Sequence, residues 1–298
     1  MKQQQQQRTY LYVGGILVAV IIVGLFFINQ NGGLGSIPLR DIHGISFTPT
    51  GELYAATHDG LIRYDDGWTV PDVAANDYMG YSGTADGFYS SGHPGATTGL
   101  TNPLGLVRST DGGETLSMLA FLGESDFHTM AASYRVNVVY VYNAYPNSEL
   151  QQGLYYTLDD GQTWMSSNAM GLAGTPISLA VHPNDSSTVA VTTERGVYLS
   201  TDYGSSFQSI AMGASMASSF DTDAGTTLYF SGDYLMQYNL ADGLTTELAL
   251  PALSASEVIT AIAVNPMNGE LALATSERDI YLANQGAWRQ IATNGYSS

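Results

Sequence analysis

The sequence predicts an all-β fold, a six-bladed β-propeller with four-stranded blades, preceded by one N-terminal transmembrane helix. Three observations lead to this prediction. A unit of four short alternating runs occurs six times after residue 37, turn residues separate the runs, and one long apolar stretch lies near the N-terminus. The 298 residues include 33 Gly and 20 Tyr but only 12% charged residues, which is typical of many short strands joined by tight turns.

The apolar stretch, residues 10–28, reads YLYVGGILVAVIIVGLFFI and carries no charge. About 20 such residues span the hydrocarbon core of a bilayer as a helix. Lys2 and Arg8 precede the stretch, and the chain after it is acidic, so the positive-inside rule predicts a cytoplasmic N-terminus. No A-x-A-like site follows, which favours an uncleaved anchor over a signal peptide. We therefore expect a single-pass protein of the cell membrane, with its C-terminal part extracellular or periplasmic.

Four regions follow from these patterns. They are a cytoplasmic tail (1–9), the anchor (10–28), a short linker (29–36) and the propeller (37–298). Within the propeller, the predicted first strands of the six units begin at Asp41, Asp77, Asp126, Thr175, Ala214 and Val258. A β-sandwich would not repeat a four-strand unit six times, so it does not explain the pattern.

Charge and cysteine content exclude several classes of function. The formal net charge is −18, with 9 Lys and Arg against 27 Asp and Glu. Such a chain repels nucleic acid, whose binding requires basic residues to neutralise phosphates, so a cation, a protein partner or a glycan fits better. The chain has no cysteine, which excludes disulfides, thiolate metal sites and a cysteine nucleophile.

Three units carry a sharper motif in the turn between their third and fourth strands. The motif reads STDGGETL at 109–116, TLDDGQTW at 157–164 and STDYGSSF at 200–207. Its aspartate can accept backbone N–H groups inside the turn, and its glycine supplies a permissive backbone. The residues to which we assign this structural role are Asp111, Gly113, Asp159, Gly161, Trp164, Asp202, Gly204 and Phe207.

This motif resembles the Asp-box, or BNR repeat, of sialidases, sortilin-type receptors and photosystem II assembly-factor-type propellers. Nearly all of the chain after residue 37 is similar to small bacterial membrane-anchored propellers that are named glycosyl hydrolase-like or sialidase-like. The resemblance implies a propeller in which the Asp-boxes lie on the blade periphery, away from the ligand face. It also implies that these motifs serve folding and not chemistry.

The first strand of each blade is expected to line a central channel. Alignment of the six first strands places His43, Met79, His128, Ile177, Met216 and Thr260 at one equivalent position. Two imidazoles and two thioethers form a set of ligands that suits copper, especially Cu(I). The sequence therefore predicts a possible copper site formed by His43, Met79, His128 and Met216.

Further polar residues cluster in the first three blades. Asp41, Asp77 and Asp126 come two residues before the channel position, and so lie on the same strand face, where they could orient imidazole N–H groups or attract a cation. His58 and His93 end the second strands of blades one and two, and are predicted to bind ligand. The longest irregular insertions, at 92–103 and 144–153, also belong to these blades, which places a predicted functional face there.

Three functions remain open on these observations. The leading hypothesis is a non-enzymatic propeller that binds a ligand or protein partner. Its most specific version is that the ligand is a metal ion. The first alternative is a glycoside hydrolase acting on cell-surface glycans, with Asp41, Asp77 and Asp126 as its acids. A sialidase holds its substrate carboxylate with three arginines, and no arginine lies within a predicted first strand. The second alternative is an assembly factor that docks on a membrane complex.

Overall fold

The computed structural model describes residues 36–298 except Gln285. The predicted tail, anchor and all but the last residue of the linker lie outside the described residues. Within the described part, no helix is long and apolar enough to cross a membrane. The predicted regions 1–9 and 10–28 therefore stay predictions.

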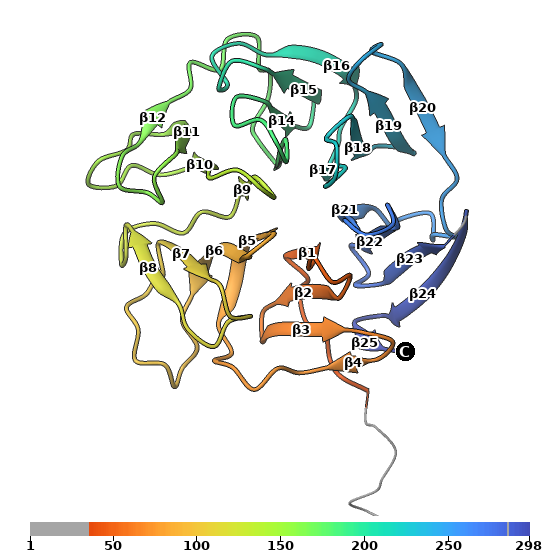
Figure 1. The fold of residues 1–298 in the computed structure, drawn as a ribbon, viewed down its shortest axis with the longest axis horizontal. Coiled ribbons are helices and arrows are strands. Elements are labelled where there is room, and N and C mark those ends of the chain that lie inside the picture. Colours follow the sequence, from red (N-terminus) through yellow and green to blue (C-terminus); the bar gives the residue numbers. More distant parts are fainter. Residues whose placement is uncertain (1–35, 285) are drawn as a thin grey trace, which may run out of the picture. The chain divides into compact units, whose positions relative to one another are not determined.

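Six antiparallel sheets stand around a common axis, and each sheet forms one blade (Figure 1). The strands of blades one to three are β1 (Gly44–Phe47), β2 (Leu53–Thr57), β3 (Gly60–Tyr64), β4 (Trp68–Thr69), β5 (Asp77–Thr84), β6 (Gly87–His93), β7 (Leu106–Ser109), β8 (Ser117–Ala120), β9 (Met130–Ala132), β10 (Val139–Asn143), β11 (Gly153–Thr157) and β12 (Met165–Ser166). The strands of blades four to six are β13 (Ser178–Val181), β14 (Val189–Thr192), β15 (Gly196–Ser200), β16 (Gln208–Met212), β17 (Ser218–Phe220), β18 (Thr227–Ser231), β19 (Leu235–Asn239), β20 (Thr245–Leu248), β21 (Ile259–Val264), β22 (Leu271–Thr275), β23 (Ile280–Asn284), β24 (Ala287–Thr293) and β25 (Tyr296–Ser297). The six-bladed all-β prediction is confirmed.

The hydrophobic core lies between neighbouring blades and not within one of them. Leu53 in β2 and Ala272 in β22 are fully buried in one cluster, which joins blade one to blade six. Leu228 in β18 is fully buried with Ala190 in β14, which joins blades four and five. Because both faces of the middle strands are covered, a run such as VAVT in β14 is buried throughout and does not alternate with polar residues.

The two ends of the propeller meet on the outer edge of blade six. The Leu39 N–H donates to the Gly295 carbonyl at 2.7 Å, and the Ser297 N–H donates to the Ile37 carbonyl at 2.9 Å. Pro38 and Tyr296 form the antiparallel bridge between these bonds. Blade six therefore contains five strands, β21 to β25, whereas the sequence predicted four for every blade.

The three aspartate turns, residues 109–116, 157–164 and 200–207, have the same hydrogen bonds. In the second of them, Asp159 accepts the Thr163 N–H at 2.8 Å and the Thr163 hydroxyl at 2.7 Å. The Thr157 hydroxyl donates to Asp159 at 2.8 Å and accepts the Gly161 N–H at 2.9 Å. Asp111 and Asp202 repeat these contacts. The turns lie between the third and fourth strands, so they hold the outer edge of blades two to four.

We expect Leu39→Ala to lower the free energy of unfolding by about 2–5 kcal/mol, because it empties a fully buried site in the segment that closes the ring. Urea unfolding of the full chain in mild detergent measures the change. Val70→Ala is the matched control, since Val70 is 62% exposed and its truncation should change stability by about 0.5 kcal/mol or less. Equal effects of the two variants would contradict this account of closure.

We expect Asp111→Asn to lower the melting temperature at neutral pH, with a difference that shrinks in acid. Hydrogen bonds from the Thr115 hydroxyl and N–H hold the pKa of Asp111 at about 2, below its ordinary value of 3.8. The carboxylate therefore contributes fully above the ordinary pKa, and this contribution is lost as the pH falls through the lower one. Thermal unfolding of both proteins at several pH values tests this, and a difference that is independent of pH would refute it.

Candidate functional site

A cavity of about 200 Å³ occupies the axis of the ring. The six inner strands and the residues just before them line it. His43, His128, Ile177, Met216 and Thr260, five of the six residues aligned from the sequence, are among these lining residues. Each of them comes at or just before the start of its inner strand, so they share one end of the channel. We call this end the mouth.

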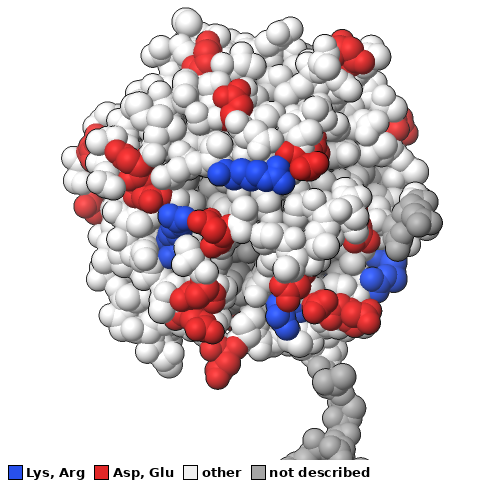
Figure 2. Space-filling view, in the orientation of Figure 1, with Lys and Arg blue, Asp and Glu red and all other residues white. Residues whose placement is uncertain are grey.

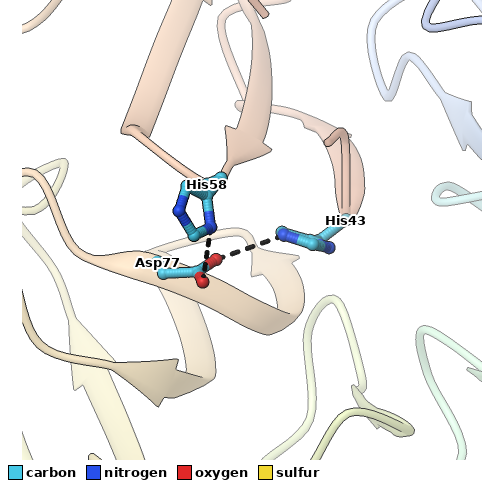
Figure 3. Close-up of side chains that lie close together, drawn as sticks. All are labelled: His43, His58 and Asp77. Atoms are coloured by element: carbon cyan, nitrogen blue, oxygen red, sulfur yellow. Dashed lines mark ion pairs between the residues drawn. The ribbon is translucent and has the colours of Figure 1, made fainter. Parts of the chain in front are cut away.

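Three side chains from blades one and two converge beside the mouth, and we call them the first cluster: His43, His58 and Asp77 (Figure 3). Nδ1 of His58 lies 2.8 Å from Oδ2 of Asp77, and Nε2 of His43 lies 3.1 Å from Oδ1. All three potential ligand atoms lie within 4.8 Å of one another. His43 precedes β1, His58 follows β2, and Asp77 begins β5 of the next blade, so the first cluster crosses a blade junction.

A β-bulge brings Asp77 into the first cluster. Asp77 pairs with His93 and Gly80 pairs with Ser91, so β5 has one more residue than β6 across this stretch. Gly92 stands opposite the bulge with φ of +138°, and a Cβ built there would lie only 2.0 Å from the Asp77 carbonyl oxygen. Blade one has Thr57 at the position of Gly92. The glycine therefore permits the close backbone approach that places Asp77.

Burial sets the electrostatics of the first cluster. The side chains of His43 and Asp77 are only 18% and 11% exposed, whereas His58 is 55% exposed. Burial lowers the pKa of His43 below 6.5, against the attraction of Asp77 and Asp41, so its imidazole is neutral at pH 7. Nε2 of His43 and Oδ1 of Asp77 are close, yet neither has a hydrogen-bond partner in the described part of the chain. Two buried polar atoms thus face each other without the alignment that a hydrogen bond needs.

A second cluster, His93, Asp126 and His128, lies at the junction of blades two and three. Oδ2 of Asp126 is 2.6 Å from Nε2 of His128 and 3.3 Å from Nε2 of His93. Hydrogen bonding to Asp126 raises the pKa of His128 above 6.5. The two clusters are close enough for charge on His128 to lower the pKa of His43.

The structure does not bring together the four residues of the predicted copper site, which are His43, Met79, His128 and Met216. Met79 is not among the residues that line the cavity. Met216 lines it, but belongs to blade five, which does not adjoin blades one to three (Figure 1). The two histidines of the set are instead assigned to separate clusters, each with a carboxylate and a histidine from the end of a second strand.

Asp41 differs from its two equivalents. It is exposed, has φ of +49°, and makes no hydrogen bond or ion pair within the described residues. Asp77 and Asp126 each face the histidine that ends the second strand of the preceding blade. Before blade one comes blade six, where this position is Ser276. Asp41 therefore has no histidine to pair with.

Two asparagines support the clusters and were not predicted from the sequence. Asn102, in the insertion at 92–103, has Oδ1 at 2.7 Å from Nδ1 of His93. Asn76 is fully buried and its Oδ1 accepts the Gly95 N–H at 2.9 Å, which fastens the same insertion beside β5. The length of the insertion was the only signal in the sequence, and it does not identify the residue that turns back to His93.

Charge is distributed over the surface without a basic patch in the view of Figure 2. Acidic side chains are scattered over this face, and the few basic ones lie beside acidic ones (Figure 2). The ion pairs of the described residues include Arg63–Glu52 and Arg108–Asp86. No Lys or Arg is among the described residues that line the channel, so the mouth suits a cation better than an anion.

Solved structures with this fold include carbohydrate-active enzymes. The GH74 xyloglucanase from Xanthomonas campestris is 18% identical, with a TM-score of 0.55 over 86% of this chain and 46% of its own. The GH74 enzyme from Niastella koreensis is 17% identical, with a TM-score of 0.58 over 87% of this chain and 46% of its own. This chain thus spans less than half the length of either enzyme, and the likeness shows the fold alone.

A third structure is closer in size. YCF48 bound to D1 peptide is 16% identical, with a TM-score of 0.50 over 86% of this chain and 83% of its own. No protein-family model matches the sequence, and no curated protein matches it.

We expect Gly92→Ala to cost about 1–3 kcal/mol of stability or more, because the new Cβ overlaps the Asp77 carbonyl and the backbone conformation disfavours a side chain. Gly67→Ala is the matched control, because a Cβ at Gly67 meets nothing within 4 Å. Urea unfolding of both variants and the wild-type chain makes the comparison. If Gly92→Ala is as stable as Gly67→Ala, the close approach does not position Asp77.

Proposed function

We propose that this chain is a non-enzymatic, membrane-anchored propeller that binds a divalent transition-metal ion at the mouth of its channel. One observation carries the proposal, namely the convergence of His43, His58 and Asp77, in which two buried ligand atoms have no hydrogen-bond partner among the described residues. Unpaired buried polar atoms are costly, and a cation between them removes the cost. The neutral state of the His43 imidazole leaves a lone pair for the ion.

The chemistry of the donors indicates which ion to test. Two imidazole nitrogens and one carboxylate oxygen suit Zn²⁺ or Cu²⁺, whereas the thioethers that favour Cu(I) are Met79 and Met216, outside the first cluster. Three protein ligands leave at least one position open, and His58 is exposed toward solvent. The bound ion would therefore be accessible to a donor group from a partner or small molecule.

The location is also part of the proposal. The uncharged stretch 10–28, with Lys2 and Arg8 before it, supports an anchor with a cytoplasmic N-terminus. The propeller would then be exposed outside the cytoplasm, where metal ions reach the mouth directly. The resemblance of the three aspartate turns to the Asp-box supports the same kind of protein, an anchored propeller of the BNR-repeat type.

A glycoside hydrolase is the second candidate, because two GH74 enzymes share the fold. Its acids would be Asp77 and Asp126, since Asp41 is exposed and makes no hydrogen bond or ion pair within the described residues. Each of the other two instead makes its close contacts with two histidines, whereas a glycosidase works with a pair of carboxyl groups. Release of oligosaccharides from xyloglucan that is abolished by Asp77→Asn or Asp126→Asn would favour this candidate over metal binding.

A docking role is the third candidate, because YCF48 bound to D1 peptide shares the fold over most of both chains. The insertions at 92–103 and 144–153 would form its recognition surface around the mouth. A partner could contribute a ligand to the open position of the ion, so docking and metal binding are compatible functions.

The proposal is tested by titrating the purified, metal-stripped full chain in detergent with Zn²⁺, followed by calorimetry. We expect His58→Ala and Asp77→Asn each to weaken the affinity of the first cluster by about 100-fold or more, because each removes one of three ligands. His182→Gln is the matched control, since His182 lies in a turn of blade four and packs on Phe220. It should bind Zn²⁺ as the wild type does.

A spectroscopic measurement identifies the ligands directly. The electron paramagnetic resonance spectrum of the Cu²⁺-loaded chain should show coupling to imidazole nitrogen, with one nitrogen fewer in His58→Ala. The proposal is wrong if the wild-type chain binds neither ion, or if His58→Ala and Asp77→Asn bind as tightly as His182→Gln.

A further inference from the structure

The second cluster repeats the first, one blade further along the chain. His93 ends β6 as His58 follows β2, and Asp126 comes before β9 as Asp77 begins β5. Both histidine–aspartate pairs cross a blade junction in the same direction, from the second strand of one blade to the inner strand of the next. The same backbone positions are therefore used twice to place an imidazole against a carboxylate.

Asn102 determines which nitrogen of His93 carries the proton. Oδ1 of Asn102 can only accept, and it lies 2.7 Å from Nδ1 of His93, so Nδ1 is the donor. In the neutral imidazole, Nε2 then presents a lone pair to Oδ2 of Asp126 at 3.3 Å. Two acceptors that face each other repel, and a cation between them converts the repulsion into attraction. A donor bond from the far nitrogen of the ring is also the usual support of a metal-bound histidine.

Asp126 has capacity for a further ligand. Its Oδ1 is buried and has no hydrogen-bond partner among the described residues, although Oδ2 faces both His93 and His128. A buried carboxylate oxygen without a partner is unfavourable. An ion bound by Asp126 and by Nε2 of His93 gives a partner to the unpaired oxygen and to the facing imidazole. Nε2 of His128 already hydrogen-bonds Oδ2 at 2.6 Å, and the three ligand atoms do not all lie within 4.8 Å of one another, so His128 would join the ion only after its ring shifts.

We infer that His93, Asp126 and His128 form a second site for a divalent transition-metal ion, so that the mouth binds two ions. The inference rests on the proposed function, because it extends metal binding from one blade junction to the next. Both histidine side chains of the second cluster are exposed, at 43% and 57%, whereas the first cluster has one exposed histidine, His58 at 55%, and one largely buried histidine, His43 at 18%. The second site is therefore the weaker of the two, because solvent competes more effectively for its ligands.

Equilibrium dialysis of the full chain against buffered free Zn²⁺, followed by elemental analysis, tests the inference. We expect the wild-type chain to bind two equivalents in two steps. Asp126→Asn and His93→Ala should each remove the weaker step and keep the tighter one. His58→Ala should remove the tighter step instead. Asn102→Ala should weaken only the weaker step, by about 10–100-fold, because it removes the group that orients His93.

The outcomes separate the two proposals. One equivalent that is lost in His58→Ala and unchanged in His93→Ala and Asp126→Asn would overturn the second site and keep the proposed function. If the wild-type chain binds one equivalent, and His58→Ala and His93→Ala each abolish it, the two clusters share a single ion. This result also overturns the second site. No bound Zn²⁺ in the wild-type chain would overturn both. His182→Gln serves again as the control for changes unrelated to the mouth.

Discussion

Backbone hydrogen bonds between residues 37–39 and β25 join the two ends of a chain that otherwise runs once around the channel. Leu39 and Leu53 lie in the same buried cluster as Ala272, so the core between blades six and one exists only when these ends meet. An open ring would expose that face of both blades.

The blade junctions also explain how the mouth holds its polar side chains on a rigid scaffold. Hydrophobic contacts hold neighbouring sheets together, and at the mouth polar groups from two sheets face one another across the junction. His58 and Asp77 come from different sheets, so their separation is determined by packing between blades and not by a single flexible loop. Ligands held in this way need little rearrangement when an ion binds.

The repeated pattern of the sequence was sufficient to predict six blades, because alternation and turn residues recur with every unit. It could not reveal β25, since two residues, Tyr296 and Ser297, carry no recognisable periodicity. The candidate site was predicted only in part. Aligning the repeats identifies residues at the same position of each blade, such as His43 and Met79. The close pairs in the structure instead join different positions of adjacent blades, as His58 and Asp77 do. The bulge opposite Gly92 and the return of Asn102 to His93 depend on tertiary packing, so no pattern in the sequence indicates either.

Because the first cluster draws its ligands from two successive blades, any ion that binds there is linked thermodynamically to the closed junction. An ion that binds only the closed form stabilises it by about 2.7 kcal/mol when its free concentration is 100 times its dissociation constant. The free energy needed to separate β2 from β5 would then depend on the free concentration of the ion. The stability of this blade junction would therefore rise and fall with the concentration of free metal around the mouth.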